Sequence, residues 1–322
     1  MQVVRVQEHG GPEVMELEEM PTPDPGPGEA RVKVEAVGVN FIDIYQRGGL
    51  YRVPLPLALG REGAGTVEAV GPNVSEVKVG DRVAWNDSQG SYATHVLARA
   101  DRLVPLPEGV GAREAAAAML QGLTAHYLSH STYPLKPGDT CLVHAAAGGV
   151  GLLLCQMARM RGARVVGTVS TDEKASLARE AGADETILYT QQDFLAEVRR
   201  LTGGRGVDVV YDSVGKDTFD KSLDCLAKRG YMVLFGQSSG PVAPVDPQIL
   251  NAKGSLFLTR PSLIDYVNTR EDLVKRAAEV LGWIVAGRLR LKIDRTYPLG
   301  EAAAAHRDLA SRRTTGKLLL IP

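Results

Sequence analysis

The sequence predicts an α/β protein in which a doubly wound parallel sheet is inserted within a β-rich domain. Short alternating strands separated by Gly/Pro turns occupy residues 1–121, apolar strands alternating with helices occupy 122–260, and mixed patterns return over 261–322. The middle pattern is typical of a parallel sheet covered by helices on both faces. We therefore expect one domain made of residues 1–121 and 261–322, and a second domain made of residues 122–260.

The composition is that of a globular protein long enough for two cores. Of the 322 residues, 44% are hydrophobic and 23% are charged, which is an ordinary profile for such proteins. Lys and Arg together number 37 against 38 Asp and Glu, so the formal net charge is only -1. This balance gives no general attraction to nucleic acid or to an anionic membrane, and it disfavours both classes of partner.

Targeting signals and disulfides are not expected. The N-terminus has no apolar run after a basic start, and no stretch approaches the roughly 20 apolar residues that span a bilayer. Cys141, Cys155 and Cys225 lie far apart in apolar segments and form no CxxC pair. We expect three reduced core thiols in a cytoplasmic protein.

The first part of the chain reads as short strands. Arg31–Val37 places apolar residues on one face and charged residues on the other, as a half-buried strand does. It follows Pro21–Glu29, whose prolines and glycines are incompatible with a helix or a central strand. Further strands are expected at Gly65–Val70, Arg82–Trp85 and Tyr92–Ala98. Frequent short strands of this kind predict a compact barrel or sandwich.

The middle part alternates between helices and strands. Helices are expected at Gly111–Leu120 and again after Gly122, because strong helix formers fill both segments. Six strands follow, at Thr140–Ala145, Arg164–Val169, Glu185–Tyr189, Val207–Ser213, Tyr231–Gly236 and Ser255–Thr259, with helices such as Glu173–Ala181, Asp193–Leu201 and Thr218–Lys228 between them. Six strands in this rhythm fit a doubly wound Rossmann domain.

The last part completes the first domain. A long helix is expected at Arg270–Val285, followed by the segment Arg288–Thr296, a helix from Glu301 and a closing strand at Lys317–Ile321. Because these pieces add most easily to the β-rich domain, the Rossmann unit is predicted to be an insertion in it.

A glycine-rich turn lies between the first Rossmann strand and the following helix. The turn, Ala145–Gly151, contains Gly148, Gly149 and Gly151. The first two glycines allow a sharp turn and close approach to a pyrophosphate, and Gly151 allows close packing of helix on strand. Free N–H groups at the helix start then face the phosphates. The turn and its βαβ context together predict a bound dinucleotide.

The end of the second strand predicts NADPH rather than NADH. An acidic residue there would bind a ribose 2′-hydroxyl, but this chain has Gly167–Thr171, with no acid on the strand end. Lys174 is placed to meet a 2′-phosphate, although Asp172 would have to turn away. Ser170 and Glu173 also fit a plain capping box with a solvated Lys174, and the two interpretations are compatible.

Several motifs, in this order, resemble those of the zinc-free, zeta-crystallin-like quinone oxidoreductases of the medium-chain dehydrogenase/reductase superfamily. They are GVNFIDIYQRGGLY (Gly38–Tyr51), GREGAG (Gly60–Gly65), VHAAAGGVG (Val143–Gly151), YDSVG (Tyr211–Gly215), SLDCL (Ser222–Leu226) and KGSLFLTRPSL (Lys253–Leu263). The resemblance extends to the terminal LLLIP and is strongest to bacterial NADPH:quinone reductases. It implies a GroES-like fold for the β-rich catalytic domain.

The resemblance also implies a site without zinc. Zinc-dependent relatives carry a cysteine and a histidine where this chain has Asn40 and Arg61, and neither an amide nor a guanidinium is a competent zinc ligand. Without a Lewis acid to hold an alkoxide, alcohol oxidation is disfavoured. His144, which precedes the glycine turn, is expected to pack at the strand end, and no hydrolase constellation of Ser, His and Asp is expected.

The residues around the cofactor follow from the resemblance. Asn40 and Tyr45 are expected to face the nicotinamide, as is Thr124, placed at the start of the helix that leads into the Rossmann domain. The others are implied at the pyrophosphate (Gly148, Gly149, Val150), at the 2′-phosphate (Ser170, Lys174, Tyr189) and along the cleft wall (Ser213, Phe235, Gly236, Ser238, Arg260, Lys317). Simpler interpretations stay open, with Tyr45 as a rim aromatic, Ser213 as a turn residue and Arg260 in a surface ion pair.

The expected reaction is direct hydride transfer from NADPH to a quinone in an interdomain cleft, with Asn40 and Tyr45 as catalytic residues that orient it. Tyr45 is also a candidate proton donor. Two alternatives are a zinc-free reductase of enoyl thioesters or other α,β-unsaturated carbonyl compounds, and a weakly catalytic NADPH- or RNA-binding protein. The apolar edge strand Ser255–Thr259 predicts a homodimer formed by strand pairing, as in similar proteins.

Overall fold

The computed structural model describes all 322 residues, and the chain divides into two compact units. Unit 1 comprises Met1–Leu123 and Tyr266–Pro322, and unit 2 comprises Thr124–Asp265. The boundaries expected from the sequence lie within a few residues of these. The first boundary falls inside a single helix, α2 (Ala112–Tyr127), where two helices were expected.

Unit 1 contains a seven-stranded sheet with the order β15-β16-β3-β5-β6-β8, in which β7 also pairs with β3. The strands are β3 (Glu29–Val39), β5 (Glu62–Val70), β6 (Arg82–Trp85), β7 (His95–Arg99), β8 (Val104–Pro105), β15 (Ile293–Pro298) and β16 (Lys317–Ile321). The closing strand β16 runs antiparallel to β3, with Leu318 opposite Val39, so the chain's last segment completes the sheet begun by its first.

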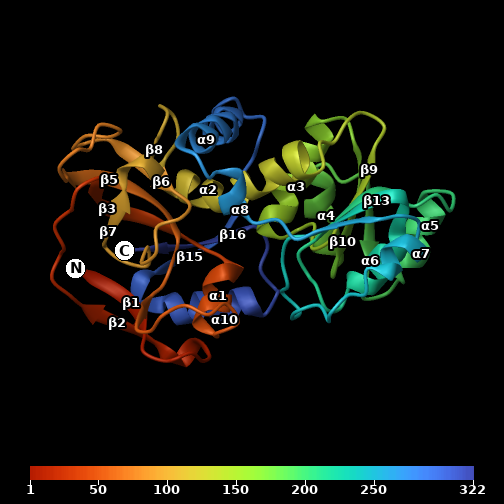
Figure 1. Cartoon of the computed structure of the whole chain (residues 1–322), viewed down its shortest axis with the longest axis horizontal. Helices are drawn as coiled ribbons and strands as arrows, with labels where there is room; N and C mark the ends of the chain where they lie inside the picture. Colours follow the sequence, from red (N-terminus) through yellow and green to blue (C-terminus); the bar gives the residue numbers. More distant parts are fainter. The chain divides into compact units, whose positions relative to one another are not determined.

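A smaller sheet and several helices complete unit 1 (Figure 1). The small sheet has the order β2-β1-β4. The remaining segments are β1 (Gln2–Val6), β2 (Met15–Glu19), β4 (Leu57–Ala58), α1 (Phe41–Arg47), α9 (Arg270–Val285), α10 (Ala302–Ala310) and the 3-10 turns η1 (Pro12–Val14), η2 (Ala100–Arg102) and η4 (Leu299–Glu301). Large side chains such as Trp85, Tyr92 and Leu103 are fully buried in its core.

Unit 2 contains a six-stranded parallel sheet with the order β11-β10-β9-β12-β13-β14. Numbered along the domain this is 3-2-1-4-5-6, the order of a dinucleotide-binding Rossmann fold. The strands are β9 (Thr140–Val143), β10 (Arg164–Val169), β11 (Glu185–Leu188), β12 (Val207–Asp212), β13 (Leu226–Leu234) and β14 (Phe257–Thr259). The central strands are buried on both faces, with Leu142, Val166 and Val210 fully covered, which explains their continuous apolar sequence.

The helices of unit 2 follow their strands (Figure 1). They are α3 (Gly149–Met160), α4 (Asp172–Glu180), α5 (Phe194–Leu201), α6 (Phe219–Cys225), α7 (Gln248–Ala252), α8 (Leu263–Tyr266, which reaches the unit boundary) and a π-helical turn, η3 (Leu128–Thr132). Side-chain caps begin two of them: Thr171 accepts from the Lys174 N–H, and Asp193 accepts from the N–H groups of Leu195 and Ala196.

Three expected boundaries were wrong. The helix expected at Thr218–Lys228 ends at Cys225, because Leu226 already pairs with Val207 and begins β13. Arg229 then adopts φ 62° within an irregular stretch of β13. The strand expected from Tyr92 starts at His95, and the edge strand expected from Ser255 starts at Phe257. Pairing with a distant strand overrides the local pattern at Leu226, and Ser255 adopts φ 57°, which does not fit a strand.

The expectations for the cysteines and His144 are confirmed. All three thiols are buried and unpaired. His144 is buried at the end of β9, where its ring nitrogens lie 2.9 Å from the hydroxyls of Thr168 and Ser222. No helix combines the length and apolarity needed to cross a membrane.

Candidate active site

The candidate residues of unit 2 gather at one edge of its sheet. Parallel strands place their carboxyl ends at the same edge, where ligands of open α/β sheets bind. The candidates follow those ends: Gly148 to Val150 after β9, Ser170 after β10, Tyr189 after β11, Ser213 after β12, Phe235, Gly236 and Ser238 after β13, and Arg260 after β14. This edge includes the point between β9 and β12 where the strand order reverses.

The glycine turn presents an uncapped helix start at that edge. Gly148 is the N-cap of α3 and makes no side-chain cap hydrogen bond. The first-turn N–H groups of Gly149 and Val150 have no intrahelical acceptors, and both residues are half-buried. A Cβ on Gly151 would lie 2.3 Å from the Ala145 oxygen, so only glycine allows the helix to pack on the turn. The backbone N–H groups of the turn are therefore available to bind an anion.

Ser170 and Tyr189 come together after the second and third strands, and Lys174 lies in the first turn of α4, just after Ser170. Thr190 Oγ1 donates to the Ser170 carbonyl over 3.0 Å, and the Tyr189 N–H donates to the Val169 carbonyl over 3.1 Å. The capping-box interpretation required Ser170 to cap α4. The structure shows that Thr171 is the cap instead. The Ser170 hydroxyl is therefore not committed to the helix cap, and the Tyr189 side chain is 49% exposed.

A second organised loop follows the fourth strand. The Ser238 N–H donates to the Ser213 carbonyl, and a Cβ on Gly236 would lie 2.6 Å from that same oxygen. The loop is held by Asp212, which is fully buried and accepts from the Val214 N–H, the Gly215 N–H and the Thr218 hydroxyl over 2.7–3.0 Å. Sequence reasoning missed Asp212, although an aspartate closing an otherwise apolar strand was a visible signal.

Thr124 and Arg260 differ from the other candidates. Thr124 lies inside α2 and not at the start of a helix, and it is buried. Arg260 is exposed at the end of β14, and its Nη1 donates to the Leu234 carbonyl over 3.2 Å. Their roles at a cofactor therefore stay predictions.

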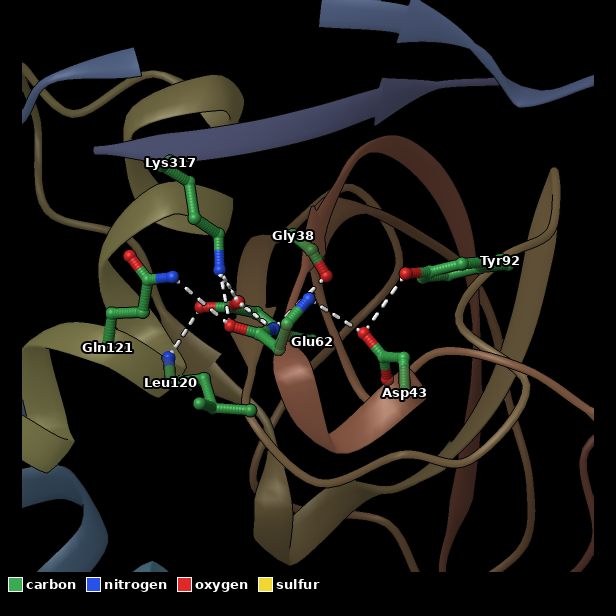
Figure 2. A network of polar contacts seen from close by, with 8 residues as sticks. Gly38, Asp43, Glu62, Tyr92, Leu120, Gln121 and Lys317 are labelled. Atoms are coloured by element: carbon green, nitrogen blue, oxygen red, sulfur yellow. Dashed lines mark hydrogen bonds and ion pairs between the residues drawn. The ribbon is translucent and has the colours of Figure 1, made fainter. Parts of the chain in front are cut away.

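In unit 1, Asn40 and Lys317 meet around Glu62. Lys317 Nζ lies 2.8 Å from Asn40 Oδ1 and pairs with Glu62 Oε2, whereas Asn40 Nδ2 donates to the same Glu62 oxygen over 2.8 Å. Figure 2 shows Lys317 reaching in from β16, opposite Leu120 and Gln121 of α2. The Leu120 N–H donates to Glu62 Oε1. The side chains of Lys317 and Glu62 are 3% and 0% exposed.

The carboxamide of Asn40 is fully engaged inside unit 1. Its two N–H donors go to Glu62 Oε2 and the Gly38 carbonyl, and its oxygen accepts from Lys317 Nζ and from Gln121 Nε2 over 3.4 Å. An asparagine amide offers two donors and two acceptor sites. Asn40 therefore has no spare hydrogen bond for a ligand unless one of these is exchanged.

Asp43 extends this network to a second row of buried groups (Figure 2). Its Oδ2 accepts from the Asn40 N–H over 2.8 Å and from the Tyr92 hydroxyl over 3.0 Å, and its Oδ1 is buried without a partner. Burial raises the pKa of Asp43 to about 7, although the Asn40 N–H, the Tyr92 hydroxyl and the Lys317 charge oppose the rise. Burial, followed by the charge of Asp43, raises the pKa of Tyr92 well above its usual value.

His306 and Arg47 continue the row. Arg47 Nη1 lies 2.9 Å from His306 Nδ1, and the Tyr92 hydroxyl lies 3.0 Å from His306 Nε2. Burial, with the neighbouring Arg47 charge, lowers the pKa of His306 to about 3, so the ring is neutral. Because Arg47 can only donate, Nδ1 accepts, Nε2–H donates to Tyr92, and Tyr92 donates to Asp43. One consistent set of protons satisfies the row.

Tyr45 stands apart from these networks. It lies on α1 between two aromatic neighbours, with ring centroids 6.0 Å from Phe41 and 5.2 Å from Tyr51. Its ring is half-buried. The structure thus gives Tyr45 a fixed aromatic setting on the helix that follows Asn40.

The donor set around Asn40 does not fit zinc. Arg61 pairs with Asp87, and Glu62 is occupied by an ammonium, an amide and a backbone N–H. His126 and His130 have the i, i+4 spacing of a ligand pair, and their rings stack at 4.4 Å. Nowhere, however, do three or more His, Cys, Asp or Glu side chains form a group that could hold a metal ion. We derive no chemical step through a metal.

Sequence reasoning missed Glu62 and Asp43. Glu62 begins β5 within the motif GREGAG, so an acidic residue in a strand of small apolar residues was the available signal. Its partner Lys317 is 255 residues away along the chain. Asp43 lies on the short helix α1 between two residues that were predicted, Asn40 and Tyr45, and it was overlooked beside them.

The two units define the class: an α/β protein with a dinucleotide-binding sheet and a separate β-rich unit that carries a buried polar cluster. Two family models match, "Alcohol dehydrogenase GroES-like domain" over residues 26–108 and "Zinc-binding dehydrogenase" over residues 149–281. The first match lies in the β-rich unit, and the second covers most of the Rossmann unit and continues past its end into α9.

Three relatives narrow the class. A quinone oxidoreductase of Pseudomonas aeruginosa is 52% identical over 98% of this chain and 97% of its own length. The 2-haloacrylate reductase of a Burkholderia species is 44% identical over 98% of both chains. The crystal structure of the Escherichia coli quinone oxidoreductase complexed with NADPH covers 100% of both chains at 46% identity, with a TM-score of 0.98. This chain belongs to the quinone oxidoreductase family of medium-chain dehydrogenases/reductases.

Proposed function

We propose that this protein reduces quinones with NADPH by direct hydride transfer, without a metal ion. The observation that carries the proposal is the carboxyl edge of the unit 2 sheet, where uncapped N–H groups of the glycine turn lie in the same edge as Ser170, Lys174 and Tyr189. An uncapped helix start suits a pyrophosphate, and a lysine with a hydroxyl suits a 2′-phosphate. The Escherichia coli relative, which has this fold, binds NADPH.

The protein's own residues supply binding and orientation. When bound, NADPH supplies the hydride. In the proposal, Gly148, Gly149 and Val150 hold the pyrophosphate, and Ser170, Lys174 and Tyr189 hold the 2′-phosphate. The adenosine and nicotinamide ends are completed by the remaining candidates, Thr124, Ser213, Phe235, Gly236, Ser238 and Arg260. Tyr45 and Lys317 approach the reacting end, and Asn40 acts there mainly by holding Lys317.

A second acceptor class has one specific observation in its favour. The 2-haloacrylate reductase relative reduces, by its name, an activated alkene acid rather than a quinone. Both acceptors take a hydride onto a conjugated system and leave negative charge on an oxygen. The same arrangement of residues therefore serves either acceptor, and only turnover distinguishes them.

The test is NADPH oxidation with a panel of acceptors in the presence of a chelator. We expect turnover with 1,4-naphthoquinone and 9,10-phenanthrenequinone, and much weaker turnover with 2-chloroacrylate and crotonyl thioester. Simple alcohols with NADP⁺ should give none. Loss of quinone turnover on chelation, or a preference for an alkene acceptor, would contradict the proposal.

We also propose a homodimer formed through β14. This strand ends the unit 2 sheet, and its Phe257 is 45% exposed and stacks on Tyr231 with centroids 4.5 Å apart. An apolar, open strand edge favours pairing with a second copy. Light scattering should give the dimer mass for the wild type and the monomer mass for Phe257→Lys; a monomeric wild type would contradict the proposal.

We further propose a cytoplasmic location, with which the three unpaired thiols agree.

A further inference from the structure

Lys317 is a buried cation in the interior of unit 1 whose donors are not all used by the protein. An ammonium has three donors, and two of them go to Glu62 Oε2 and Asn40 Oδ1. The third N–H has no partner in the protein. Long charged side chains are rarely this buried unless they are paired, and the pairing with Glu62 leaves one donor of Lys317 unused.

The surroundings of Lys317 hold the charge in one position. Glu62 neutralises it and is itself fixed by the Leu120 N–H and the Asn40 amide. A Cβ on Gly38 would lie 2.1 Å from Glu62 Oε2, so the chain leaves space for that oxygen only because residue 38 is glycine. The carboxylate, the amide and the glycine all come from the two motifs in which Asn40 and Glu62 occur.

We propose that Lys317 is the catalytic cation of this protein and that Glu62 is its positioning residue. The third N–H of Lys317 donates to the acceptor oxygen that becomes negative as the hydride arrives, and Glu62 with Asn40 fixes the ammonium for that contact. The inference rests on the proposed function, because it assumes a hydride acceptor. Lys317 then takes the place of the Asn40 carboxamide as the polar group that meets the acceptor, because both donors of that carboxamide are already used.

The chemistry balances without a proton leaving Lys317. The hydride brings two electrons and one proton to the acceptor, so one negative charge appears on its oxygen, and water supplies the second proton. Lys317 stays an ammonium throughout and acts by electrostatic stabilisation. A fixed cation that is already in place contributes most, because it does not have to reorganise during the reaction.

The experiment compares Lys317→Met, Glu62→Gln and the double variant with the wild type. Each single change leaves a buried charge without its partner and should lower Tm, whereas the double change removes both charges and should recover Tm. The hydride-transfer rate to 1,4-naphthoquinone should fall about 100-fold or more in Lys317→Met and stay low in the double variant. Recovery of the rate together with Tm would show that the pair is only structural and would overturn the inference.

A binding measurement tests the same contact without turnover. The anion of 2-hydroxy-1,4-naphthoquinone, added to the protein with NADP⁺, carries the oxygen charge that Lys317 should meet. We expect its affinity to fall at least roughly tenfold in the double variant, with NADP⁺ affinity unchanged. Equal affinity of the wild type and the double variant for this anion would overturn the inference about Lys317. Absence of quinone turnover in the wild type, with the difference in anion affinity still present, would instead count against the proposed function.

The pH profile separates positioning from packing. In Glu62→Gln the hydride-transfer rate should fall as pH rises, because a buried ammonium without a counterion loses its proton more readily. The matched control is Asp224→Asn, which removes the partner of the half-buried Lys253 in unit 2 and should leave rate, Tm and pH profile close to those of the wild type. A flat Glu62→Gln profile at the wild-type rate would contradict the role of Glu62.

Discussion

At the carboxyl edge of the unit 2 sheet, Gly149 and Val150 carry N–H groups that no side chain caps, and the Ser170 hydroxyl is not used as a helix cap. In unit 1, Asn40, Glu62 and Lys317 are buried and bind one another. The first cluster is completed only by a ligand, whereas the second is assembled before any ligand arrives. The difference suggests a division of labour in which unit 2 binds the cofactor and unit 1 holds a fixed charge for the reaction.

The largest effect on the unit 2 cluster is expected from Gly151→Ala. The added Cβ would lie 2.3 Å from the Ala145 oxygen and 2.9 Å from Ala146 Cα, which displaces the start of α3 from the phosphates. NADPH affinity, measured by fluorescence titration, should fall roughly 100-fold. The control is Gly282→Ala in α9, where nothing lies within 4 Å of the new Cβ; it should keep the affinity and add up to about 1 kcal/mol of stability.

A smaller and more selective effect is expected from Lys174→Ala. If Lys174 meets the 2′-phosphate, its loss removes a charge-assisted contact of about 1.5–3 kcal/mol. KM for NADPH should then rise roughly tenfold or more, and KM for NADH, which lacks that phosphate, should stay near the wild-type value. Equal increases for both cofactors would exclude the 2′-phosphate role and would leave Lys174 as a surface residue of α4.

Asp43→Asn is expected to have the smallest effect on NADPH and to change the pH dependence of stability instead. The pKa of Asp43 is raised from 3.8 to about 7 in the folded state, so the folded protein binds a proton more tightly than the unfolded chain. Its contribution to stability is therefore present at low pH and is lost as pH rises from about 4 to about 7. Asparagine mimics the protonated form and should remove this loss.

Urea unfolding at pH 5 and pH 8 measures the effect of Asp43→Asn. The free energy of unfolding of the variant minus that of the wild type should be larger at pH 8 than at pH 5, by on the order of a few kcal/mol. Tyr92→Phe, which removes the hydroxyl that donates to Asp43, should lower stability at both pH values. A wild-type minus variant difference that is the same at both pH values would show that Asp43 does not titrate in this range.

The sequence was sufficient for features built from neighbouring residues. The alternation of apolar strands and helices predicted the six-stranded sheet, and the spacing of Gly148, Gly149 and Gly151 predicted the turn, because both depend on local backbone geometry. The end of α6 was missed because Leu226 pairs with Val207, a contact that local propensity does not report.

The buried polar cluster was only half predicted for a related reason. Asn40 and Lys317 were candidates through the resemblance, but Glu62, which joins them, was not. The apolar neighbours of Glu62 marked it as unusual, but its partner is a lysine 255 residues away, which no local pattern identifies. Asp43 was missed in the same way, since it accepts from Tyr92, 49 residues away. Asp212 accepts from residues two to six positions further along the chain, so its role was open to a local interpretation.

The division of labour is tested most directly by measuring NADPH affinity and the single-turnover hydride-transfer rate in parallel for Lys174→Ala and the Glu62→Gln/Lys317→Met double variant. Lys174→Ala should weaken NADPH affinity and keep the rate at saturation, whereas the double variant should keep the affinity and lose the rate. If both proteins change the same quantity, the two clusters do not act separately.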